Sequence, residues 1–336
     1  MIVKAYLNWN IKLIILVCLT MSKAIMGNHL TQFQEFSCNI IINCESYQAI
    51  KTMKIHPIEA GNFKLDGGAM FGVVPKSLWQ RTNPADSNNM IDMAARCLLI
   101  ENGDRLTLID TGMGSKQSEK FFGYYYMDHV HNLDSSLHKA GFSRDDITDV
   151  FLTHLHFDHC GGVIEKKNND FFEPAFAKAK LWTNSNHWKW ATVPNAREKA
   201  SFLSENILPI QESGQLNFID QNNSFENSNE MDFDILFVDG HTEKMMIPHI
   251  NIGDKTFVYM ADLLPTAGHV PLPYVMGYDT RPLLTLDEKA QFLDQAATKG
   301  YYLILEHDPH HEIITVKHTE KGVRHDKTFT FNDLFN

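Results

Sequence analysis

Three imidazoles and a carboxylate lie within six residues of one another, at His154, His156, Asp158 and His159. Neutral imidazole and carboxylate suit a borderline divalent metal such as zinc. His154 and His156 stand two positions apart, so on extended backbone both rings leave the same face of the chain. Asp158 and His159 come after the chain has turned and should point to a second metal position beside the first. Four such groups exceed what one metal needs, so the spacing predicts a pair of metals with further ligands from elsewhere.

Buried strands are predicted to position these groups. An apolar, β-branched run over residues 147–152 is typical of such a strand, and the metal-binding stretch follows it directly. A strand that runs into a polar loop gives reactive groups a rigid support. Further ligand types follow three other apolar runs: His241 after 233–238, Asp262 after 256–260, and His307 after 302–305.

This order of ligands resembles the metallo-β-lactamase superfamily of metallo-hydrolases, whose signature is H-x-H-x-D-H followed by a distant His, Asp and His. The resemblance covers roughly Met53 to the C-terminus, with every ligand position filled. It implies an α/β fold of the αββα type, with two mixed β-sheets packed between helices, where periodicity alone gives only mixed α and β. It also implies the ligands: His154, His156 and His241 for the first metal, Asp158, His159 and His307 for the second, and Asp262 as the bridge.

Within the superfamily, residues 61–72, 108–112 and 263–270 resemble the quorum-quenching N-acyl-homoserine lactonase branch. That likeness implies two Zn²⁺ or similar ions, roughly 3.5–4 Å apart, and a shared water whose lowered pKa yields a hydroxide that opens the lactone ring. The catalytic residues it implies are Asp158, Asp262 and Tyr278, the last as the group that polarises the carbonyl. Some relatives have a tyrosine three positions after the bridging Asp, where this chain has Pro265.

Other functions are weighed against the lactonase. Another hydrolase of the superfamily, such as an organophosphate triesterase, a thioesterase or an arylesterase, shares much of the pattern. Di-iron redox relatives carry glutamate at the second histidine of the motif, where this chain has His156. The complete ligand set argues against a binding protein without catalysis. A serine nucleophile is also disfavoured, because no G-x-S-x-G elbow is present.

Charge and cysteine usage narrow the partners. The formal net charge of −11 argues against a nucleic-acid partner. The family resemblance implies a small-molecule ester or lactone as substrate. The five cysteines are odd in number and scattered, so they do not indicate a disulfide framework. Cys160 is interpreted as a small buried residue rather than a thiolate ligand. The family resemblance suggests a homodimer.

Residues 1–52 differ from the rest of the chain. Lysines precede a short apolar run over 13–21, which is too short for a stable membrane span. The segment is either a secretory signal, with Ser22-Lys23-Ala24 as cleavage site, or sequence upstream of a natural start at Met53. The first alternative implies a secreted or periplasmic protein and the second a cytoplasmic one. Residues 53–336 form the predicted hydrolase domain.

Local patterns predict several other elements. Asn102-Gly103 between apolar runs is a strong hairpin signal. Asp110 ends that hairpin, either as support for a ligand histidine or as a turn cap. Helical patterns cover residues 127–140, 187–205 with a break at Pro194, and 285–299.

Overall fold

The computed structural model of the chain describes residues 53–128, 130–167, 171–219, 225–227 and 230–335. The predicted extension over residues 1–52 lies outside this part of the chain, so both interpretations of it stay predictions. Most described strands form two mixed sheets, and one small hairpin stands apart. In strand order, the first sheet contains β1 (Lys54–Asp66), β2 (Met90–Asn102), β3 (Arg105–Ile109), β4 (Asp149–Phe151), β7 (Lys180–Asn184) and β8 (Leu216–Ile219).

The second sheet has seven described strands and is antiparallel except where β12 runs parallel to β13. Its order is β15 (Gly322–Phe329), β14 (Ile313–Thr319), β13 (Tyr302–Ile304), β12 (Lys255–Tyr259), β11 (Met245–Ile252), β10 (Asp234–Val238) and β9 (Phe225–Asn227). The separate hairpin pairs β5 (Ile164–Lys166) with β6 (Phe172–Pro174).

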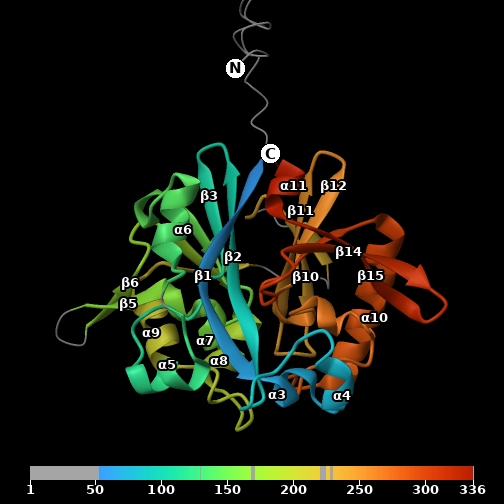
Figure 1. The fold of residues 1–336 in the computed structure, drawn as a ribbon. Helices are drawn as coiled ribbons and strands as arrows, with labels where there is room; N and C mark the ends of the chain where they lie inside the picture. Colours follow the sequence, from blue (N-terminus) through green and yellow to red (C-terminus); the bar gives the residue numbers. More distant parts are fainter. Residues whose placement is uncertain (1–52, 129, 168–170, 220–224, 228–229, 336) are drawn as a thin grey trace, which may run out of the picture. The chain divides into compact units, whose positions relative to one another are not determined.

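Helices flank the two sheets (Figure 1), which confirms the predicted α/β fold with mixed sheets. Helices α5 to α9 lie on the side of the first sheet, and α10 lies beside β14 and β15. Their bounds are α3 (Gly67–Phe71), α4 (Lys76–Trp79), α5 (Glu119–Tyr125), α6 (Leu133–Ala140), α7 (Phe157–Cys160), α8 (Ser185–Thr192), α9 (Ser204–Glu212), α10 (Pro282–Lys299) and α11 (Phe331–Phe335). Among the described residues, no helix combines the length and apolar character needed to cross a membrane.

Strand β2 shows why the sheet is buried on both faces. Its side chains alternate between two hydrophobic clusters, as the two-residue period of a strand requires. Cys97 and Leu99 pack in the cluster that includes the helices beside the first sheet. Leu98 and Ile100 pack instead with the second sheet and α10. The nearly unbroken apolar sequence of β2 therefore reflects burial on both sides.

The loops that carry the predicted ligands are tied to the sheets by backbone bonds. Ala94 N and Arg96 N in β2 donate to the carbonyl oxygens of His307 (3.1 Å) and Glu306 (3.0 Å). The buried guanidinium of Arg96 also donates to the carbonyl oxygens of Leu305 and Asp308. The loop that follows β13 in the second sheet is thus fixed against the first sheet.

The predicted hairpin is confirmed, but two helices differ from the prediction. Residues 102 and 105 pair across the turn of the hairpin, where Gly103 has a positive φ of 68°. The helix predicted over 127–140 begins only at Leu133, because the Asn132 side chain caps it by accepting from Ser135 N at 2.9 Å. Asp128 instead forms a bridge to Asn62 in β1.

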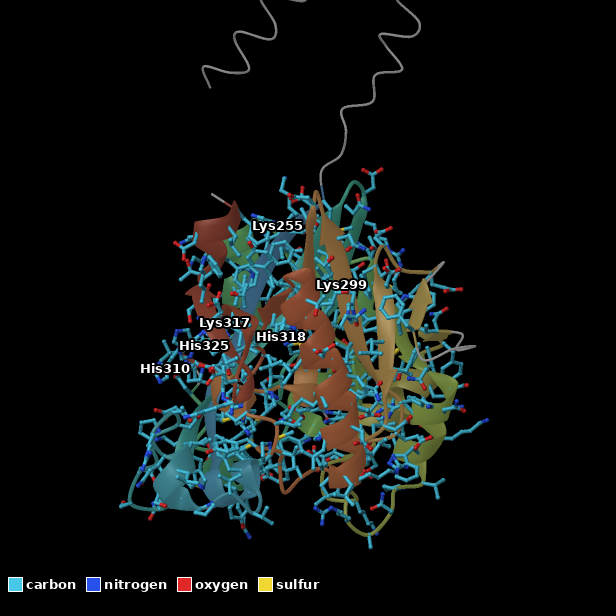
Figure 2. The ribbon with its side chains drawn as sticks, turned by 90° about the vertical axis from the view of Figure 1, so that its right-hand side faces the viewer. Lys255, Lys299, His310, Lys317, His318 and His325 are labelled. Atoms are coloured by element: carbon cyan, nitrogen blue, oxygen red, sulfur yellow. The ribbon has the colours of Figure 1, made fainter. Side chains whose placement is uncertain are left out.

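The second difference lies after β7. Helix α8 begins at Ser185, capped by the Asn184 side chain, and ends at Thr192 before Pro194. The residues up to Leu203 form turns, and α9 starts at Ser204. Figure 2 shows another face of the protein, around α10, β14 and β15. None of the basic side chains labelled there is a predicted ligand: Lys255, Lys299, His310, Lys317, His318 and His325.

Candidate metal centre

The loop after β4 is held against the loop after β3. Thr111 N donates to the carbonyl oxygen of His159 at 2.7 Å, and Gly162 N donates to that of Gly112 at 3.0 Å. A Cβ at Gly161 would collide with the carbonyl of Met113. Glycine after the metal-binding stretch is therefore required by close backbone approach rather than by the ligands themselves.

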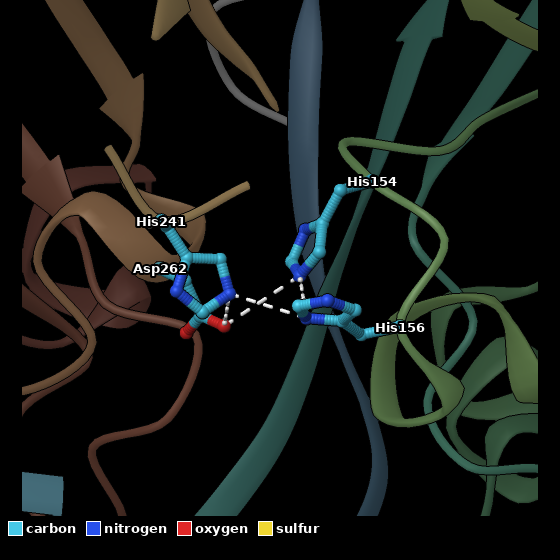
Figure 3. A group of neighbouring side chains, drawn as sticks. All are labelled: His154, His156, His241 and Asp262. Atoms are coloured by element: carbon cyan, nitrogen blue, oxygen red, sulfur yellow. Dashed lines mark hydrogen bonds and ion pairs between the residues drawn. The ribbon is translucent and has the colours of Figure 1, made fainter. Parts of the chain in front are cut away.

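Three histidines and Asp262 converge on one point (Figure 3). His156 presents Nδ1, which lies 3.1 Å from His154 Nε2 and 3.2 Å from His241 Nε2. Asp262 Oδ2 lies 3.0 Å from His241 Nε2 and 3.6 Å from His154 Nε2. The structure thus brings together four of the predicted site residues from three different loops. We refer to this group as the first cluster.

The second cluster consists of Asp158, His159 and His307. The Nε2 atoms of His159 and His307 are 3.2 Å apart, and each lies 3.9 Å from Asp158 Oδ2. Asp262 also reaches this group, with Oδ2 3.4 Å from His159 Nε2 and Oδ1 3.3 Å from His307 Nε2. Asp262 therefore stands between the two clusters.

The distances and the donor chemistry fit metal ions. Nitrogen ligands 2.0–2.1 Å from a tetrahedral zinc ion lie about 3.3 Å from one another. The distances between facing ring nitrogens in both clusters are close to this value. Asp262 Oδ1 is buried without a hydrogen bond to any described residue, and such an atom is costly unless something binds it. The clusters could hold metal ions of the kind that prefer nitrogen and oxygen ligands.

The pKa shifts of four candidate ligand histidines fall into two groups. Burial holds the pKa of His154 and His156 below the ordinary value, which favours the neutral, metal-binding form. Burial also opposes protonation of His241 and His307, but the charge and hydrogen bond of Asp262, together with Asp279 at His241 and Glu306 at His307, outweigh it and raise their pKa to about 10 and about 9. The carboxylate therefore attracts positive charge to this point, and a bound cation would displace those protons.

Each of the five histidines also has a partner for the ring nitrogen that faces away from its cluster. Such partners fix the ring orientation and the tautomer of a ligand. They are Thr153 Oγ1 for His154 (3.1 Å), Glu198 Oε1 for His156 (3.4 Å), Asp110 Oδ2 and Glu306 Oε2 for His159 (3.2 Å each), Asp279 Oδ1 for His241 (3.0 Å) and the Ala94 carbonyl for His307 (2.8 Å).

Asp110 supports the metal-binding loop. It is fully buried, and its two oxygens accept from Thr153 N (2.8 Å) and Thr153 Oγ1 (2.7 Å) as well as facing His159. Of the two interpretations made from the sequence, the geometry favours support of a ligand. Cys160 is also fully buried, and burial raises the pKa of its thiol to about 12, as expected of a small apolar residue.

Sequence reasoning missed three carboxylates, Glu198, Asp279 and Glu306. Glu198 and Asp279 lie on loops and face ligand histidines more than thirty residues away, in no motif. The sequence carries no signal for these two carboxylates, because only the folded chain brings them close to those histidines. Glu306 directly precedes His307 and was visible in the sequence, but its neighbour His159 comes from another loop.

His187 holds the backbone between the first two ligands. Its Nε2 accepts a hydrogen bond from Leu155 N at 2.8 Å, and its Nδ1 donates to the carbonyl oxygen of Glu243 at 2.5 Å. Burial lowers its pKa to about 3, so the ring is neutral, as these two bonds require. His187 is therefore a structural residue of this site.

Replacing His187 with alanine is expected to lower the free energy of unfolding of the metal-free protein by about 1–3 kcal/mol, because the buried Leu155 N–H loses its acceptor. Denaturant melts would measure the loss. His138→Ala, at an exposed position in the last turn of α6, provides the control and should change stability far less. Equal effects of the two variants would contradict the role given to His187.

A cavity of about 340 Å³ opens beside both clusters. Ligand side chains form one part of its lining, and apolar side chains form another, including Leu65, Met70, Phe157 and Met276. A volume of this size suits a small organic molecule, and a mixed lining can bind an apolar group beside a reacting polar one.

Two tyrosines, Tyr125 and Tyr278, also line this cavity. Burial raises the pKa of both phenols, and the charge of Asp158 raises it further, so both keep a proton to donate. Tyr278 is 39% exposed. His269 differs from these tyrosines, because both of its ring nitrogens already have hydrogen-bond partners. They are the Met70 carbonyl oxygen for Nε2 (2.9 Å) and Thr266 Oγ1 for Nδ1 (2.8 Å).

The sequence and the fold were compared with known proteins. Residues 91–312 match the family model described as the metallo-beta-lactamase superfamily. The N-acyl homoserine lactonase AiiB of Agrobacterium fabrum is 31% identical over 120 residues, which are 33% of this chain and 42% of AiiB. The match thus spans less than half the length of that curated relative.

Two solved structures are similar over most of the chain. A probable metal-dependent hydrolase from Staphylococcus aureus has a TM-score of 0.73 and 26% identity, covering 84% of this chain and 100% of its own. AidC, a dizinc quorum-quenching lactonase solved with the product N-hexnoyl-L-homoserine, has a TM-score of 0.68 and 24% identity, covering 83% and 95%. At that identity, the likeness to AidC shows the shared fold.

Proposed function

Since the chain belongs to the metallo-beta-lactamase superfamily, we propose that this metallo-hydrolase opens the ring of N-acyl-homoserine lactones with the help of two zinc ions. The observation that carries the proposal is the position of Asp262 between two donor clusters in the lining of one cavity. The names of AiiB and AidC, both lactonases, support the choice of substrate.

We assign the ligands as the sequence predicts them. His154, His156 and His241 would hold the first ion, Asp158, His159 and His307 would hold the second, and Asp262 would contribute to both. When bound, such a pair of ions supplies an activated water as nucleophile and polarises the substrate carbonyl. The outer partners of the histidines keep the donor atoms aimed at the ions.

The remaining steps fall to residues that line the cavity. Tyr278 keeps its proton and donates a hydrogen bond to the carbonyl oxygen as negative charge develops there. Asp158 is the more exposed of the two ligand carboxylates, so it is placed to take the proton that the attacking water loses and to pass it to the ring oxygen as the ester bond breaks. Apolar side chains such as Leu65 and Met276 bind the acyl chain.

The lining offers few side chains of its own that could bind an anionic substrate. Besides the histidines, Arg197 is the one basic side chain among the described residues of the lining, and it already donates to the carbonyl oxygens of Gly277 and Asp279. A phosphate ester anion would therefore depend on the histidines and the metal ions for its binding, whereas a neutral ester needs no such counter-charge.

One panel of substrates tests the proposal. The full chain, loaded with zinc, is assayed with an N-acyl-homoserine lactone, p-nitrophenyl acetate, paraoxon and nitrocefin. We expect the lactone to give the highest kcat/KM. A higher value for paraoxon would replace the lactonase with a triesterase, and one for p-nitrophenyl acetate would replace it with an arylesterase.

Metal content is a separate prediction. Active protein should contain close to two equivalents of zinc or a similar ion by elemental analysis, and a chelator should abolish hydrolysis until metal is restored. One firmly bound ion in fully active protein would contradict the shared role of Asp262. Homodimer formation also stays a prediction, which light scattering on the same sample would test.

A further inference from the structure

His156 faces the first cluster differently from its neighbours. It presents Nδ1 to the ring nitrogens of His154 and His241, so its Nε2 points outward. That Nε2 lies 3.4 Å from Oε1 of Glu198. Both atoms are buried, and neither makes a hydrogen bond of normal geometry to another described residue. Two buried polar atoms therefore face each other.

Glu198 is held in place through its other oxygen. Its Oε2 accepts from Trp190 Nε1 at 2.7 Å and from Asn195 Nδ2 at 2.5 Å. The Asn195 side chain in turn accepts from Glu198 N at 3.2 Å, which fixes the turn. The carboxylate is only 3% exposed in spite of its charge. Such burial is costly unless every oxygen has a donor, and besides Trp190 and Asn195 the donors beside this carboxylate are His156 and the Thr242 hydroxyl.

We propose that Glu198 is a positioning residue of the metal centre, which accepts a hydrogen bond from the Nε2–H of His156 and so holds the tautomer whose Nδ1 lone pair points to the position of the first metal. A carboxylate behind a ligand histidine fixes the ring and increases its basicity. This role of Glu198 deepens the proposed function. It depends on only one part of that function, a metal ion bound at the first cluster.

The segment that carries Glu198 also reaches the loop around Tyr278. Arg197 donates to the carbonyl oxygens of Gly277 and Asp279. Asp279 supports His241 through Oδ1, just as Glu198 supports His156. Two of the three histidines in the first cluster are thus held from outside by carboxylates on two loops that Arg197 joins.

The decisive variant is Glu198→Gln. Glutamine has one side-chain oxygen where glutamate has two, so it cannot accept from His156 and from the Trp190 and Asn195 pair at once. We expect zinc affinity at one of the two sites to fall about 10–100-fold, as for other outer partners of ligand histidines. Competition with a chromophoric chelator measures this in the full chain, without substrate. The absorption spectrum of the cobalt(II) form should change as well.

The matched control is Trp190→Phe, which removes a donor to Oε2 and leaves the Oε1 contact with His156 in place. It should keep wild-type zinc affinity. Glu212→Gln, at an exposed position on α9, controls for the loss of one negative charge and should also bind zinc normally. The metal-free forms of all three variants should melt near the wild-type temperature.

Three results would overturn the role of Glu198. They are unchanged zinc affinity in Glu198→Gln, an equal loss in Trp190→Phe, and a loss matched by a lower melting temperature of the metal-free protein. The last two would mean that Glu198 acts only by folding the loop. Because zinc affinity is measured without substrate, a wild-type protein that binds two ions but spares acyl-homoserine lactones would refute the proposed function alone.

Discussion

Asp262→Ala is expected to remove bound metal and hydrolytic rate together. Asp262 Oδ2 lies within 3.6 Å of ring nitrogens in both clusters, and its loss leaves each ion one ligand short. Stabilisation of the transition state by metal is worth several kcal/mol. Since each 1.36 kcal/mol is a factor of ten, kcat/KM should fall roughly 10³-fold or more.

The electrostatics of the metal-free protein should change with it. Burial opposes protonation of His241 and His307, and Asp262 supplies the charge that raises their pKa. Without that charge, burial is opposed only by Asp279 at His241 and by Glu306 at His307, so the pKa of both rings should fall. NMR titration of the metal-free variant would show this as a lower pKa for both rings, independently of catalysis.

Asp326→Asn is the matched control for this variant. Asp326 is an exposed carboxylate that pairs with Lys317 at 2.8 Å on the face shown in Figure 2, and it belongs to neither cluster. In Asp326→Asn, both the zinc content by elemental analysis and kcat/KM should match those of the wild type. If Asp262→Ala kept two equivalents of zinc, the assignment of Asp262 as a shared ligand would be wrong.

The clustering of the candidate ligands was predictable because their signal is local. His154, His156, Asp158 and His159 share one short stretch, and the other candidate ligands each follow an apolar run that does form a strand, as with Asp262 after β12. Alternation along strands and the Asn-Gly turn are also local properties, which is why the β2–β3 hairpin could be predicted.

What could not be predicted depends on contacts between distant segments. Glu198 follows Pro194 inside the helical pattern predicted over residues 187–205, but the chain forms turns there, and only this folded loop brings its carboxylate to His156. The helix predicted from residue 127 begins at Leu133, because Asp128 N donates to Asn62 O in β1 instead of continuing a helix. In both cases a tertiary contact decides the outcome.

Tyr278→Phe is expected to keep both metal ions but to lower kcat about 10²-fold. Tyr278 lines the cavity with Asp158 and Asp262, and burial keeps its hydroxyl protonated. Removing one donor to a developing oxyanion costs about 10²–10³ in kcat. The lower end applies, because metal ions already polarise the carbonyl. Elemental analysis and steady-state kinetics with an acyl-homoserine lactone would separate the two effects.

Tyr125→Phe is the natural comparison, because Tyr125 lines the same cavity and its pKa is also raised by burial. If Tyr278 is the donor, Tyr125→Phe should leave kcat near the wild-type value. Full turnover in Tyr278→Phe with both ions in place would refute the assignment and turn attention to Tyr125. His269 would not replace it, since its ring nitrogens already bind Met70 O and Thr266 Oγ1. Tyr274 packs edge-on against Phe71, so among the described residues Tyr125 is the tyrosine with a comparable position in the cavity.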